Sequence, residues 1–188
     1  MARVYLKKST KTASTGSDDV RKTVLDILNE IEFGGDAAAL KYAVEFDGYV
    51  GNLILTNDEI QMACDLVPEK LKQDIQFAHA NVKRFAEAQR GTVTDFETEI
   101  VPGLIAGQKS IPCNAAGCYV PGGRYSHVAS AIMTVTTAKV AGCQHITACS
   151  PPAKDSGIAP AIVYAANLCG ADKILAMGGV QGVASMTF

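Results

Sequence analysis

Three short segments of the sequence carry the residues best suited to hold a ligand. They are Tyr119–Arg124, Cys149–Pro152 and Met177–Gln181. Each follows a short apolar run and precedes a helical pattern, with glycine or proline at the turn. Paired glycines let the backbone approach a ligand with no Cβ atom in between. None of the segments contains the G-x-G-x-x-G fingerprint of dinucleotide binding. The motifs alone therefore leave two alternatives, a nucleotide-binding site and ordinary strand-to-helix turns.

The elements that must position these segments form a β-α-β-α-β pattern after Asn114. Strands are predicted over 116–120, 145–149 and 173–177, and helices over about 128–141 and 160–169, each helix ending at a glycine. A spacing of roughly thirty residues between strands suits parallel pairing with a helical crossover. Ligands of such sheets bind at the carboxyl ends of the strands, beside unpaired N–H groups of helix N-termini. The three segments are therefore expected to meet at one edge of a Rossmann-like parallel α/β sheet.

The chain before this sheet is predicted to be mainly helical. A helical pattern begins behind Ser17, is interrupted at Gly34-Gly35 and continues toward Gly48. A helix over 68–91 follows a second, capped helix start at Thr56, and it carries a predicted apolar stripe of Leu71, Ile75, Ala78, Val82 and Phe85. Extended connectors are predicted between residues 91 and 114. The chain thus divides into an α-rich N-terminal segment with short connector strands, residues 1–114, and a nucleotide-binding half, residues 115–188.

Composition narrows the class of protein and its compartment. The 188 residues are 48% hydrophobic with a formal charge of −2 and no basic stripe, which argues against a nucleic-acid partner. Polar residues interrupt every long apolar stretch, and the N-terminus has no signal-peptide apolar region, so we expect a cytoplasmic protein that does not enter a membrane. Six cysteines without a C-x-x-C pair indicate buried free thiols. An alternative is that one of them, Cys118 or Cys149, is a nucleophile of an aldehyde-dehydrogenase type.

Several separated motifs together resemble histidinol dehydrogenases. The runs Gly117–Gly123, Ser130–Gly142, Ala148–Pro152, Leu168–Ala171 and Gly178–Gln181 follow one another with that family's order and spacing. The resemblance implies a Rossmann-like fold related to aldehyde dehydrogenases, an NAD-dependent and zinc-requiring oxidation of a primary alcohol to a carboxylic acid, and a homodimer. It also implies that this chain corresponds to the N-terminal part of such an enzyme, whose zinc ligands and acid–base pair lie beyond residue 188. The sheet would then be left with an unpaired edge.

The resemblance assigns cofactor roles only to matching positions. It implies that Tyr119 and Gln181 contact NAD and that Pro121, Gly122 and Gly123 form the loop beside the cofactor. A tyrosine offers an apolar face with a polar tip, and a glutamine amide both donates and accepts, which agrees with these roles. The alternative is that both side chains only pack the turns. No catalytic residue and no metal ligand is assigned in this chain.

The segment that follows the glycines departs from the usual histidinol enzymes. It reads Arg124-Tyr-Ser-His127, which is closer to the sulfopropanediol dehydrogenase branch of the family, whose members oxidise 2,3-dihydroxypropane-1-sulfonate to sulfolactate. A sulfonate favours a guanidinium, an imidazolium and a helix N-terminus, so Arg124 and His127 are candidate substrate residues. The alternatives are a surface arginine and a helix-capping histidine, with L-histidinol as the substrate. A further alternative for the whole chain is an inactive nucleotide-binding or interaction module.

Overall fold

The computed structural model describes residues 18–122 and 125–188. Its elements are, in chain order, α1 (Asp18–Tyr42), the π-helix η2 (Ala43–Asp47), α2 (Asn57–Asp65), α3 (Glu69–Gly91), β1 (Phe96–Val101), β2 (Leu104–Gln108), β3 (Ala115–Tyr119), α4 (Val128–Ala141), β4 (His145–Ser150), α5 (Pro160–Cys169), β5 (Lys173–Ala176) and α6 (Gly179–Thr187). The predicted α/β class is confirmed. The predicted Ser17 cap and the Gly123 and Arg124 positions lie outside the described residues.

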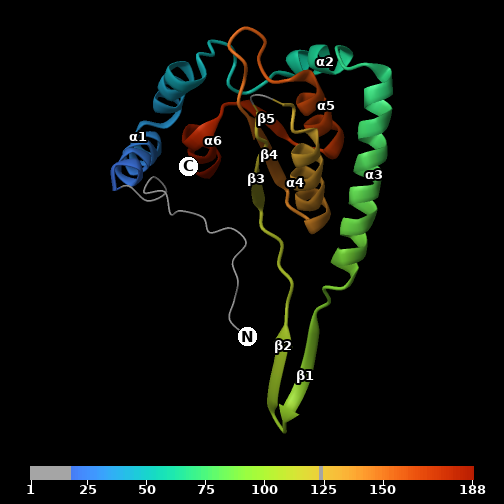
Figure 1. The fold of residues 1–188 in the computed structure, drawn as a ribbon. Helices are drawn as coiled ribbons and strands as arrows, with labels where there is room; N and C mark the ends of the chain where they lie inside the picture. The colour runs from blue at the N-terminus through green and yellow to red at the C-terminus, as the bar shows by residue number, and fades with distance from the viewer. Residues whose placement is uncertain (1–17, 123–124) are drawn as a thin grey trace, which may run out of the picture.

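A parallel sheet with the strand order β3-β4-β5 lies at the centre of the molecule. In the register, Cys118 of β3 faces Ala148 of β4, which faces Ile174 of β5. Helices α4 and α5 cover one face with α3 outside them, and α6 covers the other face with α1 outside it (Figure 1). The β-α-β-α-β prediction is therefore confirmed, with strand ends within one residue of the expected positions.

The core forms where β4, the middle strand, meets the helices. Ile146 and Ile174 are almost fully buried and pack in one cluster with Val135 of α4 and Val163 of α5. Ile75 of α3 belongs to the same cluster, so the helical segment and the sheet share apolar contacts. Burial of this apolar area is the main term that favours the folded state.

The helical segment follows its predicted breaks, and its predicted stripe is confirmed in part, since Ile75 is buried and Ala78 and Val82 pack against the core. Gly35 interrupts α1 with φ 55° and ψ −142°, and the capping box of Thr56 and Glu59 is present at α2. On α3, however, Ala86 is buried while Phe85 is 66% exposed. One residue turns a helix by about 100°, so α4 and α5 contact the line that runs through Ile75 and Ala86 and leave Phe85 in solvent.

The outer edge of β5 is partly paired with a segment outside the sheet. Ile54 forms an antiparallel bridge with Leu175. The Leu55 N–H donates to the Ile174 carbonyl at 3.0 Å, and the Ala176 N–H donates to the Leu53 carbonyl at 2.7 Å. The short apolar segment Leu53–Leu55 therefore satisfies part of the hydrogen-bonding groups of this edge.

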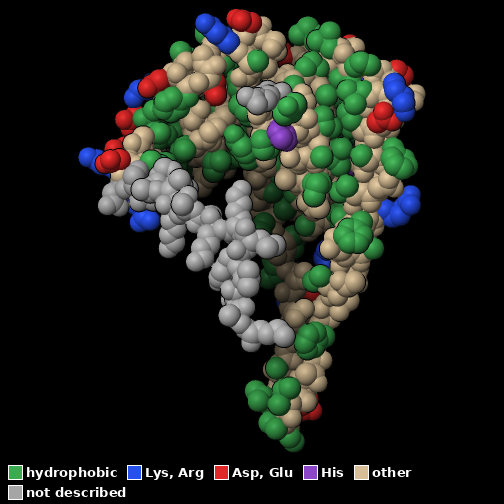
Figure 2. All heavy atoms as spheres, in the orientation of Figure 1, with side chains coloured by type: hydrophobic (Ala, Val, Ile, Leu, Met, Phe, Trp, Pro, Cys, Tyr) green, Lys and Arg blue, Asp and Glu red, His purple; other side chains and the backbone are tan. Residues whose placement is uncertain are grey.

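Strands β1 and β2 form a separate antiparallel hairpin that extends away from the body (Figure 1). Every residue of both strands is exposed. Its apolar side chains are visible at the far end of the molecule (Figure 2). Among the described helices, none is both long and apolar enough to span a lipid bilayer.

Candidate functional site

The loops after the three parallel strands meet at Pro151. A Cβ atom added at Gly122 would lie 2.6 Å from Pro151 Cγ, and one added at Gly178 would lie 2.6 Å from Pro151 Cβ. Real Cβ atoms do not approach other carbons this closely, so glycine is required on both sides of the proline. The expectation that the three segments converge at one edge of the sheet is confirmed.

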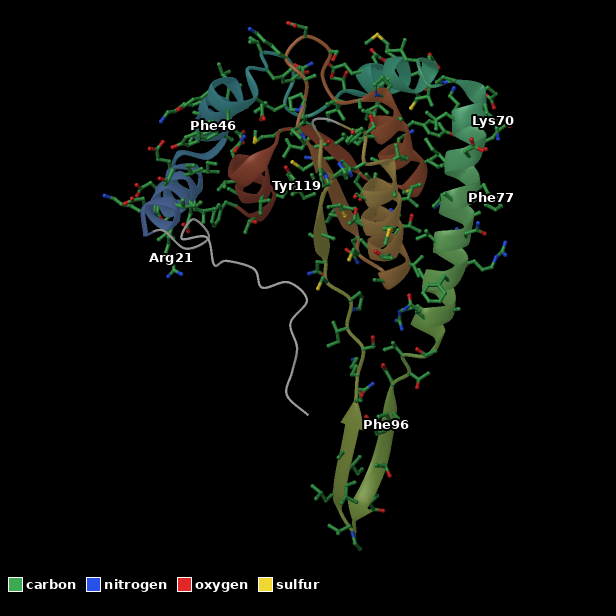
Figure 3. The ribbon with its side chains drawn as sticks, viewed as in Figure 1. Arg21, Phe46, Lys70, Phe77, Phe96 and Tyr119 are labelled. Atoms are coloured by element: carbon green, nitrogen blue, oxygen red, sulfur yellow. The ribbon has the colours of Figure 1, made fainter. Side chains whose placement is uncertain are left out.

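Tyr119 and the start of α6 are in direct contact at this edge. The Gly179 N–H donates to Tyr119 Oη at 3.2 Å. Figure 3 shows Tyr119 between β3 and α6. Because the Tyr119 oxygen accepts from the backbone, its own proton remains available to donate to a ligand or to water. Tyr119 is half-buried, which leaves part of the ring accessible.

Gln181 lies close to the same turn, but its amide is already bound. Gln181 is only 3% exposed, and its Nε2 donates to Asp47 Oδ2 at 3.2 Å. The same carboxylate oxygen accepts the Gly178 N–H at 3.0 Å. The structure therefore brings Tyr119 and Gln181 to the same Gly178-Gly179 turn and adds Asp47, which binds both the turn and Gln181.

Sequence reasoning missed Asp47. It lies in the run Phe46-Asp-Gly48, to which the sequence analysis gave no role. Asp47 is the last residue of η2, and Gly48 ends that helix with φ 62°. π-helical turns are rare and often occur at functional positions, which is the local signal that the sequence pattern did not reveal.

Two hollows flank this edge of the sheet. A groove of about 530 Å³ between α1 and α6 has an almost entirely apolar lining of Val24, Leu28, Tyr119, Gly179, Val180 and Val183. A smaller hollow of about 250 Å³ lies on the other side and includes Gly122, Tyr125, Ser126 and Pro151 in its lining. The volume and apolar walls of the larger groove, with one tyrosine hydroxyl, suit a flat ring such as those of a dinucleotide. Pro121 is exposed beside Gly122.

Two of the N–H groups that were expected to be free at the start of α6 are already bound. The Gly178 N–H is bound to Asp47 and the Gly179 N–H to Tyr119. A carboxylate at a helix N-terminus also takes the position that a phosphate would prefer. The residues around Tyr119 thus fit the ring and hydroxyl groups of a dinucleotide, and the Asp47 carboxylate makes the start of α6 less favourable for its pyrophosphate.

The predicted substrate residues lie on the loop before α4. His127 occupies the N-cap position of α4, is exposed, and makes no capping hydrogen bond through its side chain. His127 therefore has the position of a helix cap, but its side chain does not cap the helix. Arg124 and Gly123 fall outside the described residues.

Within residues 18–122 and 125–188, no three His, Cys, Asp or Glu side chains form a group that could hold a metal ion, so these residues do not fit a zinc site.

The two candidate nucleophiles, Cys118 and Cys149, do not have the features of a reactive thiol. All six are free, and Cys64, Cys118, Cys149 and Cys169 are buried. Burial raises the pKa of the Cys118 thiol. Burial and, second, the Asp47 carboxylate raise the pKa of Cys149 to about 12. The Cys149 thiol instead donates to the Met177 carbonyl at 3.0 Å. The nucleophile alternative therefore has no support at either position.

Cysteine alkylation provides a first prediction. At pH 8 we expect iodoacetamide to modify exposed Cys113 and to leave Cys149 unmodified, because a thiol with a pKa of about 12 is ionised in only about one molecule in 10⁴. Peptide mass spectrometry after timed quenching measures both sites, and Cys113→Ser is the matched control. Rapid labelling of Cys149 in the folded chain would contradict this assignment.

The raised pKa of Cys149 also predicts a dependence of stability on pH. Since the Cys149 thiol of the unfolded chain ionises near pH 9.0, the free energy of unfolding should fall as the pH rises from about 9 toward 12.

Comparison with known proteins gives consistent matches. A family model described as histidinol dehydrogenase matches residues 10–188. The sulfopropanediol 3-dehydrogenase of Ruegeria pomeroyi is 66% identical over 184 residues, which cover 98% of this chain and 42% of that protein. The histidinol dehydrogenase of Methanosarcina barkeri is 37% identical and covers 93% of this chain and 40% of that protein. The crystal structure of histidinol dehydrogenase from Elizabethkingia anophelis has a TM-score of 0.83 at 33% identity, over 93% of this chain and 40% of that chain. The chain thus spans 40–42% of the length of these three relatives.

Proposed function

Since this chain belongs to the histidinol dehydrogenase family, we propose that it supplies the NAD-binding part of a dehydrogenase that oxidises a primary alcohol. The observation that carries the proposal is the contact of Tyr119 with the Gly178-Gly179 turn beside an apolar groove. Strand carboxyl ends are the usual place for nucleotides in parallel α/β sheets. The second candidate, an inactive binding module, would use the same groove without turnover.

The residues of this edge have distinct tasks in the proposed complex. Val24, Leu28 and Val183 exclude water from one face of a planar ring, and the Tyr119 hydroxyl donates to a polar atom of the cofactor. Gly122 allows the adjoining loop to pass close to Pro151, which keeps the hollow beside it narrow. Bound NAD supplies the hydride acceptor. The chain's own contribution is to hold and orient that acceptor.

For the substrate we favour 2,3-dihydroxypropane-1-sulfonate, oxidised through the aldehyde to sulfolactate in two hydride transfers. Sequence identity to the sulfopropanediol 3-dehydrogenase of Ruegeria pomeroyi is 66%, against 37% to the histidinol dehydrogenase of Methanosarcina barkeri. The unpaired His127 imidazole at the start of α4, together with Arg124, suits an anionic sulfonate. L-Histidinol is the second candidate substrate. We assign no zinc-dependent step to the described residues, and a homodimer remains part of the proposal.

The cofactor role is tested by removing one hydroxyl. Tyr119→Phe should weaken NADH binding about threefold to tenfold, because one hydrogen bond contributes about 0.5–1.5 kcal/mol. Quenching or enhancement of NADH fluorescence measures the dissociation constant. The matched control is Tyr125→Phe, since Tyr125 is 71% exposed and lies in the other hollow. Equal affinities for all three proteins would contradict a role for Tyr119.

A turnover assay distinguishes the dehydrogenase from the inactive binding module. We expect the 188-residue chain to bind NADH but not to produce it, because the family's acid–base and zinc residues are not assigned to any position in it. A protein that joins this sequence to the remaining part found in its relatives should reduce NAD with dihydroxypropanesulfonate faster than with histidinol. Sustained NADH production by the 188-residue chain alone would refute the first expectation, and preference for histidinol would refute the second.

A further inference from the structure

We infer that Asp47 is a positioning residue of the cofactor site, which orients the Gln181 amide and holds the Gly178-Gly179 turn. The inference rests on the proposed function, because its importance lies in what the turn presents to a dinucleotide. One carboxylate oxygen, Asp47 Oδ2, accepts two hydrogen bonds, from the Gly178 N–H at 3.0 Å and from Gln181 Nε2 at 3.2 Å. Gln181 is almost fully buried, so this contact is protected from water.

The carboxylate decides which way the amide points. An ionised carboxylate only accepts hydrogen bonds, so the NH₂ group of Gln181 must face Asp47. The carbonyl oxygen of Gln181 is then directed toward Gly179, where an added Cβ atom would lie 2.8 Å from Oε1. Gly179 is the residue whose N–H is bound by Tyr119. The turn therefore presents an acceptor, Gln181 Oε1, and a donor, the Tyr119 hydroxyl.

This polarity defines the chemical class of ligand group that the turn accepts. A carboxylate next to the α6 N-terminus repels phosphate, while an oriented carbonyl favours a group that donates a hydrogen bond. A ribose hydroxyl or a carboxamide N–H meets that requirement. We assign the ribose or carboxamide part of NAD to the Tyr119 groove and place its pyrophosphate away from α6.

Asp47 also links parts of the chain that are far apart in sequence. It lies at the end of η2, 131 residues before Gly178 and 134 before Gln181. A Cβ atom added at Gly178 would approach Asp47 Oδ1 to 3.0 Å, so the carboxylate is packed closely against the turn. The helical segment thus takes part in the site although it supplies no other polar contact to this turn among the described hydrogen bonds.

The test compares variants that keep or remove the two accepted hydrogen bonds. Asp47→Asn retains an oxygen that can accept both, so we expect NADH affinity within about threefold of the unmodified chain. Asp47→Ala removes both and should weaken binding by at least about tenfold. Asp26→Ala is the matched control, because Asp26 is an exposed aspartate on α1. Equal loss in the Asn and Ala variants would overturn the positioning role, and so would unchanged binding in the Ala variant.

A second pair of variants tests the polarity. Gln181→Glu places two carboxylates together and should weaken NADH binding by at least about tenfold. Combining it with Asp47→Asn gives the new carboxylate a donor, so the double variant should bind more tightly than Gln181→Glu alone. A double variant that binds no better than the single one would refute the orientation argument. Inorganic pyrophosphate should compete with NADH more weakly for the unmodified chain than for Asp47→Asn, and the reverse order would overturn the exclusion of phosphate.

Thermal unfolding tests the contact between Asp47 and Gln181 independently of NADH binding. If the unmodified chain shows no saturable NADH binding, the proposed function fails at the cofactor step. The contact itself is then judged by the unfolding midpoints of Asp47→Ala, Gln181→Ala and their combination. Coupled residues should give a combined decrease smaller than the sum of the single decreases, whereas additive decreases would contradict the contact. In the protein that joins this sequence to the remaining part found in its relatives, Asp47→Ala should raise KM for NAD with little change in kcat.

Discussion

Gly178→Ala is expected to destabilise the fold and to abolish most NADH binding. The added methyl group would lie 2.6 Å from Pro151 Cβ and 3.0 Å from Asp47 Oδ1. Pro151 Cβ belongs to a rigid ring and the Asp47 carboxylate is held by two hydrogen bonds, so the turn must shift away from Pro151 and Asp47. Overpacking of this kind costs about 1–3 kcal/mol in unfolding free energy. Since the shift separates Gly179 from Tyr119, we expect at least about a tenfold loss of NADH affinity.

The matched control for this variant is Gly91→Ala at the end of α3. No atom lies within 4 Å of a Cβ added at Gly91. Alanine favours helix over glycine by about 1 kcal/mol, so this variant should be neutral or slightly stabilising. Urea denaturation and NADH titration measure both effects. If Gly178→Ala and Gly91→Ala give the same midpoint and the same affinity, the close packing of the three loops is wrong.

Ile146→Ala is expected to have the largest effect on stability. Ile146 lies in the middle strand of the sheet, is fully buried, and packs in the core cluster that includes Val135 and Val163. Removing its side chain leaves a cavity between the sheet and α4 or α5. Such truncations cost about 2–5 kcal/mol, which is a large part of the total stability of a small domain. Chemical denaturation followed by circular dichroism gives the change in unfolding free energy.

Ile105→Ala provides the corresponding control in the hairpin. Ile105 is 66% exposed on β2, away from the core (Figure 1). Substitutions at exposed positions usually change stability by less than about 0.5 kcal/mol. A loss at Ile105 as large as the loss at Ile146 would show that the hairpin is packed against another surface in solution.

The sequence determined the local elements of this protein. Helix and strand periodicity, the glycine stops at Gly142 and Gly170, and the capping box at Thr56 all reproduce the observed element boundaries closely. These signals depend on residues within one or two turns of each other, so they can be read along the chain. The parallel sheet followed from the same patterns, because consecutive strands separated by a helix pair in parallel.

The tertiary structure decided which distant residues meet. Whether Phe85 or Ala86 is buried depends on the line of contact with α4 and α5, and whether β5 has a free edge depends on Leu53–Leu55 returning to it. The Asp47 contact joins positions more than 130 residues apart, and no local pattern marks it. Pairings of this kind form only after the layers pack, because they depend on the relative placement of whole helices and strands. Tyr119 and Gln181 were predicted as cofactor residues from local and family-like signals, whereas the Asp47 carboxylate beside them is apparent only in the packed fold.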